Sequence, residues 1–154
     1  MSISNAVVID ANILVAICSK EQDTHPVASS VFNSYAQTGY EFFAPNAIIS
    51  EVLFALCVKL RSGVLIQANY DIAIDTFADL MQMISMPSDE SALIKRAVGI
   101  RGSYDCKRTS DSLYIAFAED LAKTRAVELV TFDNGMKNQI ANFAPTVALN
   151  LLSI

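Results

Sequence analysis

The chain has 154 residues, of which 53% are hydrophobic and 18% are charged, and its formal net charge is −5 with a pI near 4.7. This composition excludes a disordered chain and predicts one domain over residues 1–154 that buries a single core. The negative charge argues against a protein that coats nucleic acid by general electrostatics, so any contact with nucleic acid must be local.

Membrane insertion and secretion are not expected from this sequence. Polar residues interrupt every apolar run well before the length of about 18 residues that a membrane-spanning helix needs. The first basic residue is Lys20, so no basic region precedes the first apolar run, and we expect no signal peptide. The three cysteines lack metal or redox spacing, which favours reduced thiols in a cytoplasmic protein.

The first predicted element is a buried strand that ends at a carboxylate. Residues Ala6 to Ile9 form a short, β-branched apolar run, and Asp10 follows it directly. Ligands bind at the carboxyl ends of the strands in an open parallel sheet, so we expect Asp10 to face a cleft. The pattern then predicts a short helix over Ile13–Cys18, a helix from Pro26 to Gly39, and a strand over Glu41–Ala44.

A second acidic residue lies on the apolar face of the next predicted helix, Ala47 to Arg61. Glu51 shares this face with Ile48 and Val52. Burying an unpaired charge is costly, so Glu51 must be neutralised by a cation, paired with a base such as Lys59, or placed at the rim of a cleft. An ion pair and a functional role both remain open for it.

The middle of the chain carries structural signals only. A long helix is predicted over Leu65–Met83, and three aspartates along it form a solvated row opposite its apolar stripe. A short strand follows at Ile84–Met86, and Ser88 and Ser91 begin a helix that ends near Gly99 to Gly102. The side chains of the long helix that we expect to face inward are Ile72, Ala73, Phe77, Leu80 and Met81.

Two further acids lie at element boundaries near the C-terminus. Asp111 begins a helix that runs to Arg125, with Thr109 or Ser110 as its cap. Stabilisation of the helix dipole, worth about 0.3 to 1 kcal/mol, would account for an acid there. However, Asp111 also shares its face with the apolar residues Tyr114, Ile115 and Ala118. The strand Val127–Phe132 ends at Asp133 and thus repeats the pattern of Asp10, and a short helix and a last strand, Thr146–Leu152, follow.

A local basic region leads into Asp111. It holds five of the eleven basic residues: Lys95, Arg96, Arg101, Lys107 and Arg108. A solvated helix face followed by a polar loop is the simpler interpretation. Lys107 and Arg108 are the nearest of the five to Asp111, and we interpret them as candidate phosphate contacts.

Together these elements predict an α/β fold with a mainly parallel sheet. In such a sheet Asp10 and Asp133 would stand together if their strands are neighbours, and Glu51 and Asp111 could join them from flanking helices. Four carboxylates without histidine or thiol would require a hard divalent cation such as Mg²⁺ or Mn²⁺. The chemistry that such a site supports is metal-assisted hydrolysis of a phosphodiester.

Four segments, in this order, resemble the successive acidic motifs of PIN-domain nucleases. The resemblance implies a PIN-like three-layer α/β/α fold, endoribonuclease activity, and Mg²⁺ or Mn²⁺ bound by Asp10, Asp111 and Asp133 with support from Glu51. It also implies that Asn12 and Thr131 are polar cleft residues that contact the substrate. The segments are Val8-Ile9-Asp10-Ala11-Asn12-Ile13-Leu14, Ser50-Glu51-Val52-Leu53, Ser110-Asp111-Ser112-Leu113-Tyr114-Ile115-Ala116 and Leu129-Val130-Thr131-Phe132-Asp133.

In size the chain is similar to the VapC-type toxins of toxin–antitoxin pairs, which implies an RNA substrate, a homodimer and an antitoxin partner. The main alternative is a non-catalytic PIN-like domain that binds RNA or protein. A phosphoacceptor module would need a lysine at a strand end, and none follows the last strands. A haloacid-type phosphatase would need a second aspartate where Asn12 stands.

Overall fold

A computed structural model describes residues 2–154 and shows a five-stranded sheet in which every pairing is parallel. The strand order is β3-β2-β1-β4-β5, so β1 is central and its neighbours are β2 and β4. The strands are β1 (Ala6–Ile9), β2 (Glu41–Phe43), β3 (Ile84–Ser85), β4 (Val127–Thr131) and β5 (Ala148–Leu151).

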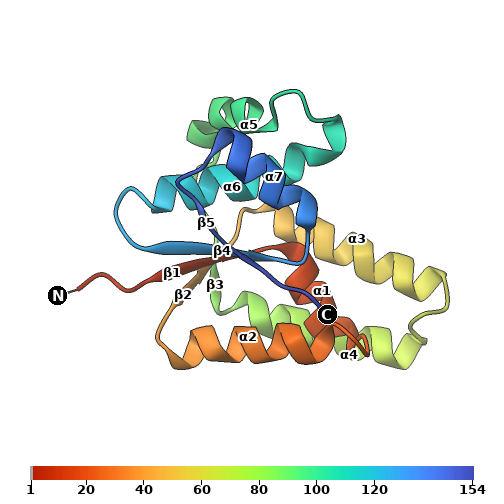
Figure 1. Cartoon of the computed structure of the whole chain (residues 1–154). Coiled ribbons are helices and arrows are strands. Elements are labelled where there is room, and N and C mark those ends of the chain that lie inside the picture. Colours follow the sequence, from red (N-terminus) through yellow and green to blue (C-terminus); the bar gives the residue numbers. More distant parts are fainter. Residues whose placement is uncertain (1) are drawn as a thin grey trace.

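Helices cover both faces of this sheet (Figure 1). Helices α1, α2 and α4 lie on one face, α5, α6 and α7 lie on the other, and α3 contacts α1 and α4 at the side. This arrangement confirms the predicted three-layer α/β/α fold. The α-helices are α1 (Ala11–Ser19), α2 (His25–Gln37), α3 (Ala47–Arg61), α4 (Gln67–Met81), α5 (Ile94–Arg101), α6 (Thr109–Leu121) and α7 (Asn134–Phe143).

The pairing of β1 with β4 positions the acids that end these strands. Ile9 pairs with Val130, and the Asp10 backbone N–H donates to the Val130 carbonyl at 3.1 Å. The chain runs outward from β1 to β2 and β3 on one side, and β4 and β5 add on the other side. The carboxyl ends of β1 and β4 therefore form the switch point at which an open parallel sheet has its ligand crevice.

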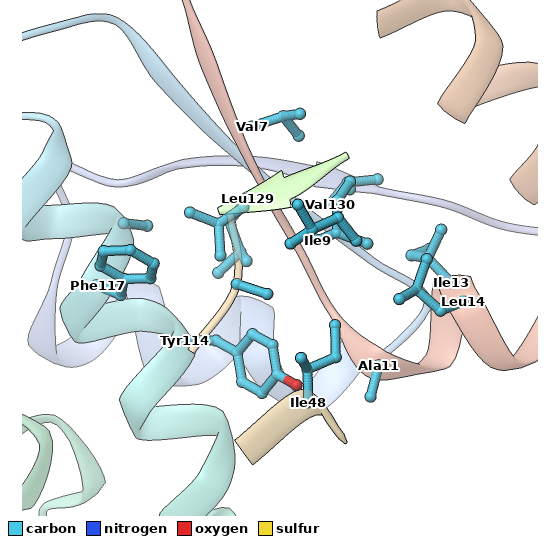
Figure 2. Packing of buried hydrophobic residues seen from close by; sticks show 14 of the residues in the cluster. Val7, Ile9, Ala11, Ile13, Leu14, Ile48, Tyr114, Phe117, Leu129 and Val130 are labelled. Carbon is cyan, nitrogen blue, oxygen red and sulfur yellow. The ribbon is translucent and has the colours of Figure 1, made fainter. Parts of the chain in front are cut away.

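The core lies on both faces of the sheet and extends to this edge. Every residue of β1 is completely buried, as expected for a central parallel strand with helices on both faces. Figure 2 shows Tyr114 pointing from α6 toward Ile48 and Ala11, so that its hydroxyl reaches the end of the sheet where β1 stops. The Tyr114 hydroxyl is thus a polar group that the apolar packing places near the predicted site.

The exposed side of α4 differs from the prediction. The helix spans Gln67–Met81 rather than Leu65–Met83, and Ile72, which was predicted to face inward, is 51% exposed. Ala73 and Phe77 are buried and lie four residues apart, so they define the packed stripe. Ile72 is one residue away from that line and therefore points about 100° around the helix, into solvent.

The start of α6 also differs from the prediction. The helix begins at Thr109, so Thr109 and Ser110 lie inside its first turn and neither is its cap. A short 3₁₀ helix, η2 (Cys106–Arg108), comes just before α6, and Asp105 caps η2 by accepting from the Lys107 backbone N–H at 2.8 Å. Asp111 does lie in the first turn of α6, as predicted.

The helices described over residues 2–154 are all too short or too polar to cross a bilayer.

Leu129 and Phe54 provide a matched test of the described core. Leu129 is completely buried, and we expect Leu129→Ala to lower the free energy of unfolding by about 2 to 5 kcal/mol in urea denaturation. Phe54 is 72% exposed, and Phe54→Ala should change it by less than about 0.5 kcal/mol. Equal losses in the two variants would contradict the described packing.

Candidate active site

Asp10 is a buried carboxylate between the two central strands. Its backbone is extended and precedes the first turn of α1, and its side chain accepts a hydrogen bond from Thr131 Oγ1 at 2.6 Å. The pKa of Asp10 is raised to about 7, mainly by burial; the bond from Thr131 opposes the rise, and the charges of Asp111 and Glu51 add to it. Asp10 thus lies close enough to two other acids for their charges to interact.

Thr131 and Asn12 connect the two loops that carry Asp10 and Asp133. Thr131 Oγ1 accepts from Asn12 Nδ2 at 3.1 Å and from the Asp133 backbone N–H at 3.0 Å. Asn12 Oδ1 in turn accepts from the Phe132 backbone N–H at 3.3 Å. Both predicted cleft residues therefore position the acids, whereas contact with a substrate stays a prediction for them.

Glu51 is half-buried on α3, and its partner is a tyrosine rather than a base. Tyr114 donates from its hydroxyl to Glu51 Oε1 at 3.1 Å. Lys59, the alternative partner considered for Glu51, pairs with Glu21 instead. Burial raises the pKa of Glu51, the charge of Asp111 adds to this, and the bond from Tyr114 opposes it.

Tyr114 was predicted only as part of the apolar face of α6, and its role beside Glu51 was missed. Its side chain is completely buried, and burial raises its pKa, with further contributions from the charges of Asp10 and Glu51. The hydroxyl therefore keeps its proton and acts as a donor. The available signal was a tyrosine on the same apolar face as Asp111, because a buried phenol hydroxyl needs a polar partner.

Asp111 and Asp133 share a single arginine. Arg108 Nη1 donates to Asp111 Oδ2 at 2.9 Å, and the same nitrogen pairs with Asp133 Oδ2. Burial raises the pKa of Asp111 and the charge of Asp133 contributes, whereas the bond from Arg108 opposes the rise. Asp133 also caps α7, because its Oδ1 accepts from the Gly135 backbone N–H at 2.8 Å.

The rest of the basic region does not reach the acids. Lys107 is exposed, and the bond it makes near the site is from its backbone N–H to Asp105. Arg96 forms a bidentate pair with Glu119, and Arg101 donates to the Tyr104 carbonyl at 2.9 Å. Of the five basic residues, the described contacts therefore bring only Arg108 to the candidate site.

Ser112 and Gln139 form a buried connection that sequence reasoning missed. Ser112 Oγ donates to the Arg108 carbonyl at 2.8 Å and accepts from Gln139 Nε2 at 2.6 Å. Both side chains are almost completely buried. They join α7 to the start of α6 and so fix the backbone of Arg108. Ser112 lies on the buried face of α6, and a polar residue on such a face indicates a buried hydrogen bond, which was the available signal.

An open groove of about 800 Å³ starts at this site. Its lining is mainly apolar and includes several polar side chains, as is typical of ligand sites. The lining residues include Asn12, Glu51, Ala55, Phe132, Asn134 and the segment 151–154.

The donor set suits a divalent cation, although the described residues form no ready-made cage. Within residues 2–154, His, Cys, Asp and Glu side chains form no group of three or more that could already hold a metal ion. However, Asp10, Glu51 and Asp111 each have a raised pKa, in part because of another acid of the site. A hard cation would relieve this repulsion, and carboxylate oxygens are the ligands that Mg²⁺ and Mn²⁺ prefer.

Comparison with protein families gives a match that covers most of the chain. A family model described as PIN domain matches residues 7–140, which contain all four acids. No curated protein matches the chain.

The burial of Asp10 predicts a pH dependence of stability in protein treated with EDTA. The pKa of Asp10 is about 7 when folded and near 3.8 in its ordinary state, so the folded protein binds the extra proton. Stability should therefore fall as pH rises from about 4 to 7, and Asp10→Asn should remove this part of the fall. We expect the variant to match the wild type near pH 4.

At pH 8 the same variant should be more stable than the wild type by roughly 2 to 4 kcal/mol in chemical denaturation. Asp75→Asn is the matched control because Asp75 is exposed on α4. Parallel pH profiles for wild type and Asp10→Asn would contradict the burial of this charge.

Proposed function

Because the chain belongs to the PIN domain family, whose members are typically metal-dependent nucleases, we propose that it is a divalent-metal-dependent endoribonuclease that hydrolyses RNA phosphodiester bonds. The observation that carries this proposal is the buried carboxylate of Asp10, whose pKa is raised by burial and by the charges of Asp111 and Glu51. Such an accumulation of acids at a sheet's switch point favours the binding of cations over any purely structural role.

Asp10, Asp111 and Asp133 would hold Mg²⁺ or Mn²⁺, and Glu51 would support them. A bound divalent ion supplies activation of water and stabilisation of the charge that develops on the phosphate. Thr131 and Asn12 keep Asp10 and the Asp133 loop at a fixed separation through their hydrogen bonds.

RNA would approach along the groove that begins beside Glu51. Its apolar lining and the polar ends of Asn12 and Asn134 suit a nucleotide next to the scissile phosphate. Lys107 and Arg108 are the proposed phosphate contacts, because they are the basic residues just before α6. Their local charge would act against the net charge of −5.

We also propose that the protein is a VapC-type toxin that acts in the cytoplasm as a homodimer and is inhibited by an antitoxin protein. The order of the four acidic motifs and the chain length support this assignment. Exposed apolar residues on α3 support an assembly, because a monomer leaves them in water: Leu53, Phe54 and Val58. Light scattering in solution tests the dimer.

One observation favours a second candidate, a non-catalytic PIN-like domain that binds RNA or protein. Arg108 already pairs with both Asp111 and Asp133, and residues 2–154 contain no ready-made metal group. A site of this kind could persist without a metal. The two candidates differ in whether Mg²⁺ binds at all.

Loss of Asp10 should abolish metal-dependent cleavage of RNA. We expect Asp10→Asn to lower the rate of Mg²⁺-dependent cleavage of a single-stranded RNA by at least about 100-fold while the circular dichroism spectrum is retained. Asp75→Asn removes the same charge from an exposed position on α4 and should cleave as the wild type does. Cleavage that survives EDTA or the loss of Asp10 would disprove the nuclease proposal.

Binding of the ion should also stabilise the fold, which separates the two candidates. We expect millimolar Mg²⁺ or Mn²⁺ to raise the Tm of the wild type by several degrees in a thermal melt, because the ion binds the folded state alone. Asp111→Asn should reduce this rise. An unchanged Tm at every Mn²⁺ concentration would favour the non-catalytic domain.

A further inference from the structure

Arg108 bridges two of the four acids through a single nitrogen atom. Its Nη1 donates to Asp111 Oδ2 at 2.9 Å and pairs with Asp133 Oδ2. The two acids come from different helix starts, α6 and α7. A guanidinium between two carboxylates has the position and the sign of charge that a metal ion would have there.

The backbone beneath this guanidinium is held rigidly. The Arg108 carbonyl accepts from Ser112, and Ser112 accepts from Gln139 on α7. Since both of these side chains are buried, the start of α6 cannot shift relative to α7 without breaking a buried hydrogen bond. The position of the arginine is therefore built into the fold.

Gly135 provides the space into which the guanidinium fits. A methyl group on Gly135 would overlap the guanidinium atoms of Arg108. The backbone does not demand glycine at this position, because Gly135 is absent from the positive-φ residues and lies in the first turn of α7. Alanine would ordinarily favour a helix more than glycine does. A side chain at this position would therefore displace the guanidinium of Arg108.

We propose that Arg108 is an internal counter-ion of Asp111 and Asp133, which it must release before a divalent cation can bind. This inference rests on the proposed function and deepens it. Two positive groups compete for the same carboxylate oxygens, so the arginine lowers the affinity of the site for the ion. The released guanidinium then becomes available for an RNA phosphate, so that Arg108 would serve both as the counter-ion and as the predicted phosphate contact.

Mn²⁺ alone, without RNA, is the probe for this competition. We expect isothermal titration calorimetry to show that Arg108→Ala binds Mn²⁺ roughly 10-fold more tightly than the wild type. A change of this size is usual where two groups compete for one site. Gly135→Ala should tighten binding in the same direction, because its methyl group displaces the guanidinium. The double variant should bind no more tightly than Arg108→Ala.

Lys107→Ala is the matched control, since it removes the same charge from the neighbouring exposed residue. It should leave the Mn²⁺ affinity within about 2-fold of the wild type, because exposed charges are screened by salt. Tightening by Lys107→Ala equal to that of Arg108→Ala would show a general effect of charge and would overturn the proposal.

A second measurement in EDTA tests the packing independently of any metal. Gly135→Ala should lower the Tm of the wild type but raise it, or leave it unchanged, in the Arg108→Ala background. Equal effects in both backgrounds would show that Arg108 does not occupy the space at Gly135.

The outcomes separate this proposal from the proposed function. Equal Mn²⁺ affinities for wild type and Arg108→Ala would overturn the counter-ion role while leaving a metal-dependent enzyme intact. Absence of Mn²⁺ binding in all variants would overturn both.

Discussion

The hydrogen bond from Thr131 to Asp10 joins the two central strands where both of them end. Asp10 is 5% exposed, so its carboxylate has lost most of its water and needs a donor within the protein. The hydroxyl of Thr131 has one proton and two lone pairs, and all are engaged: it donates to Asp10 and accepts from Asn12 and the Asp133 backbone. One side chain thereby sets the spacing of two acids.

The four acids are stabilised in two different ways. Asp10 and Glu51 receive bonds from neutral hydroxyls, whereas Asp111 and Asp133 share the guanidinium of Arg108. Within residues 2–154, the described contacts thus bring a single cation to four carboxylates. The site has an excess of negative charge, which explains why burial and neighbouring acids raise the pKa of several of its members. That excess is the physical basis for proposing a divalent ion.

The same charge distribution bears on how a negatively charged chain could act on RNA. A net charge of −5 repels a polyanion at long range, so attraction must come from local groups. Arg96 and Arg101 are engaged elsewhere, in bonds to Glu119 and the Tyr104 carbonyl. Arg108 is held at the site itself by Asp111 and Asp133, and its release from these acids would place its charge beside an RNA phosphate.

The sequence by itself determined the order of the elements, an α/β fold with a mainly parallel sheet, and the acids at the ends of β1 and β4. These features follow from local patterns: a strand that stops at Asp10 or Asp133 can be recognised from a few neighbouring residues. The exposed position of Ile72 was missed because two adjacent helix positions can both look apolar, and only packing decides which one is covered.

Only the tertiary structure decided which groups the acids contact. Glu51 meets Tyr114, 63 positions away in the chain, rather than Lys59 on its own helix. Arg108 reaches Asp133 because Ser112 and Gln139 fix α6 against α7 and because Gly135 leaves room. Which partner each acid contacts depends on distances across the fold. The identity of a residue constrains its own local conformation, but it says little about which distant residues will lie beside it.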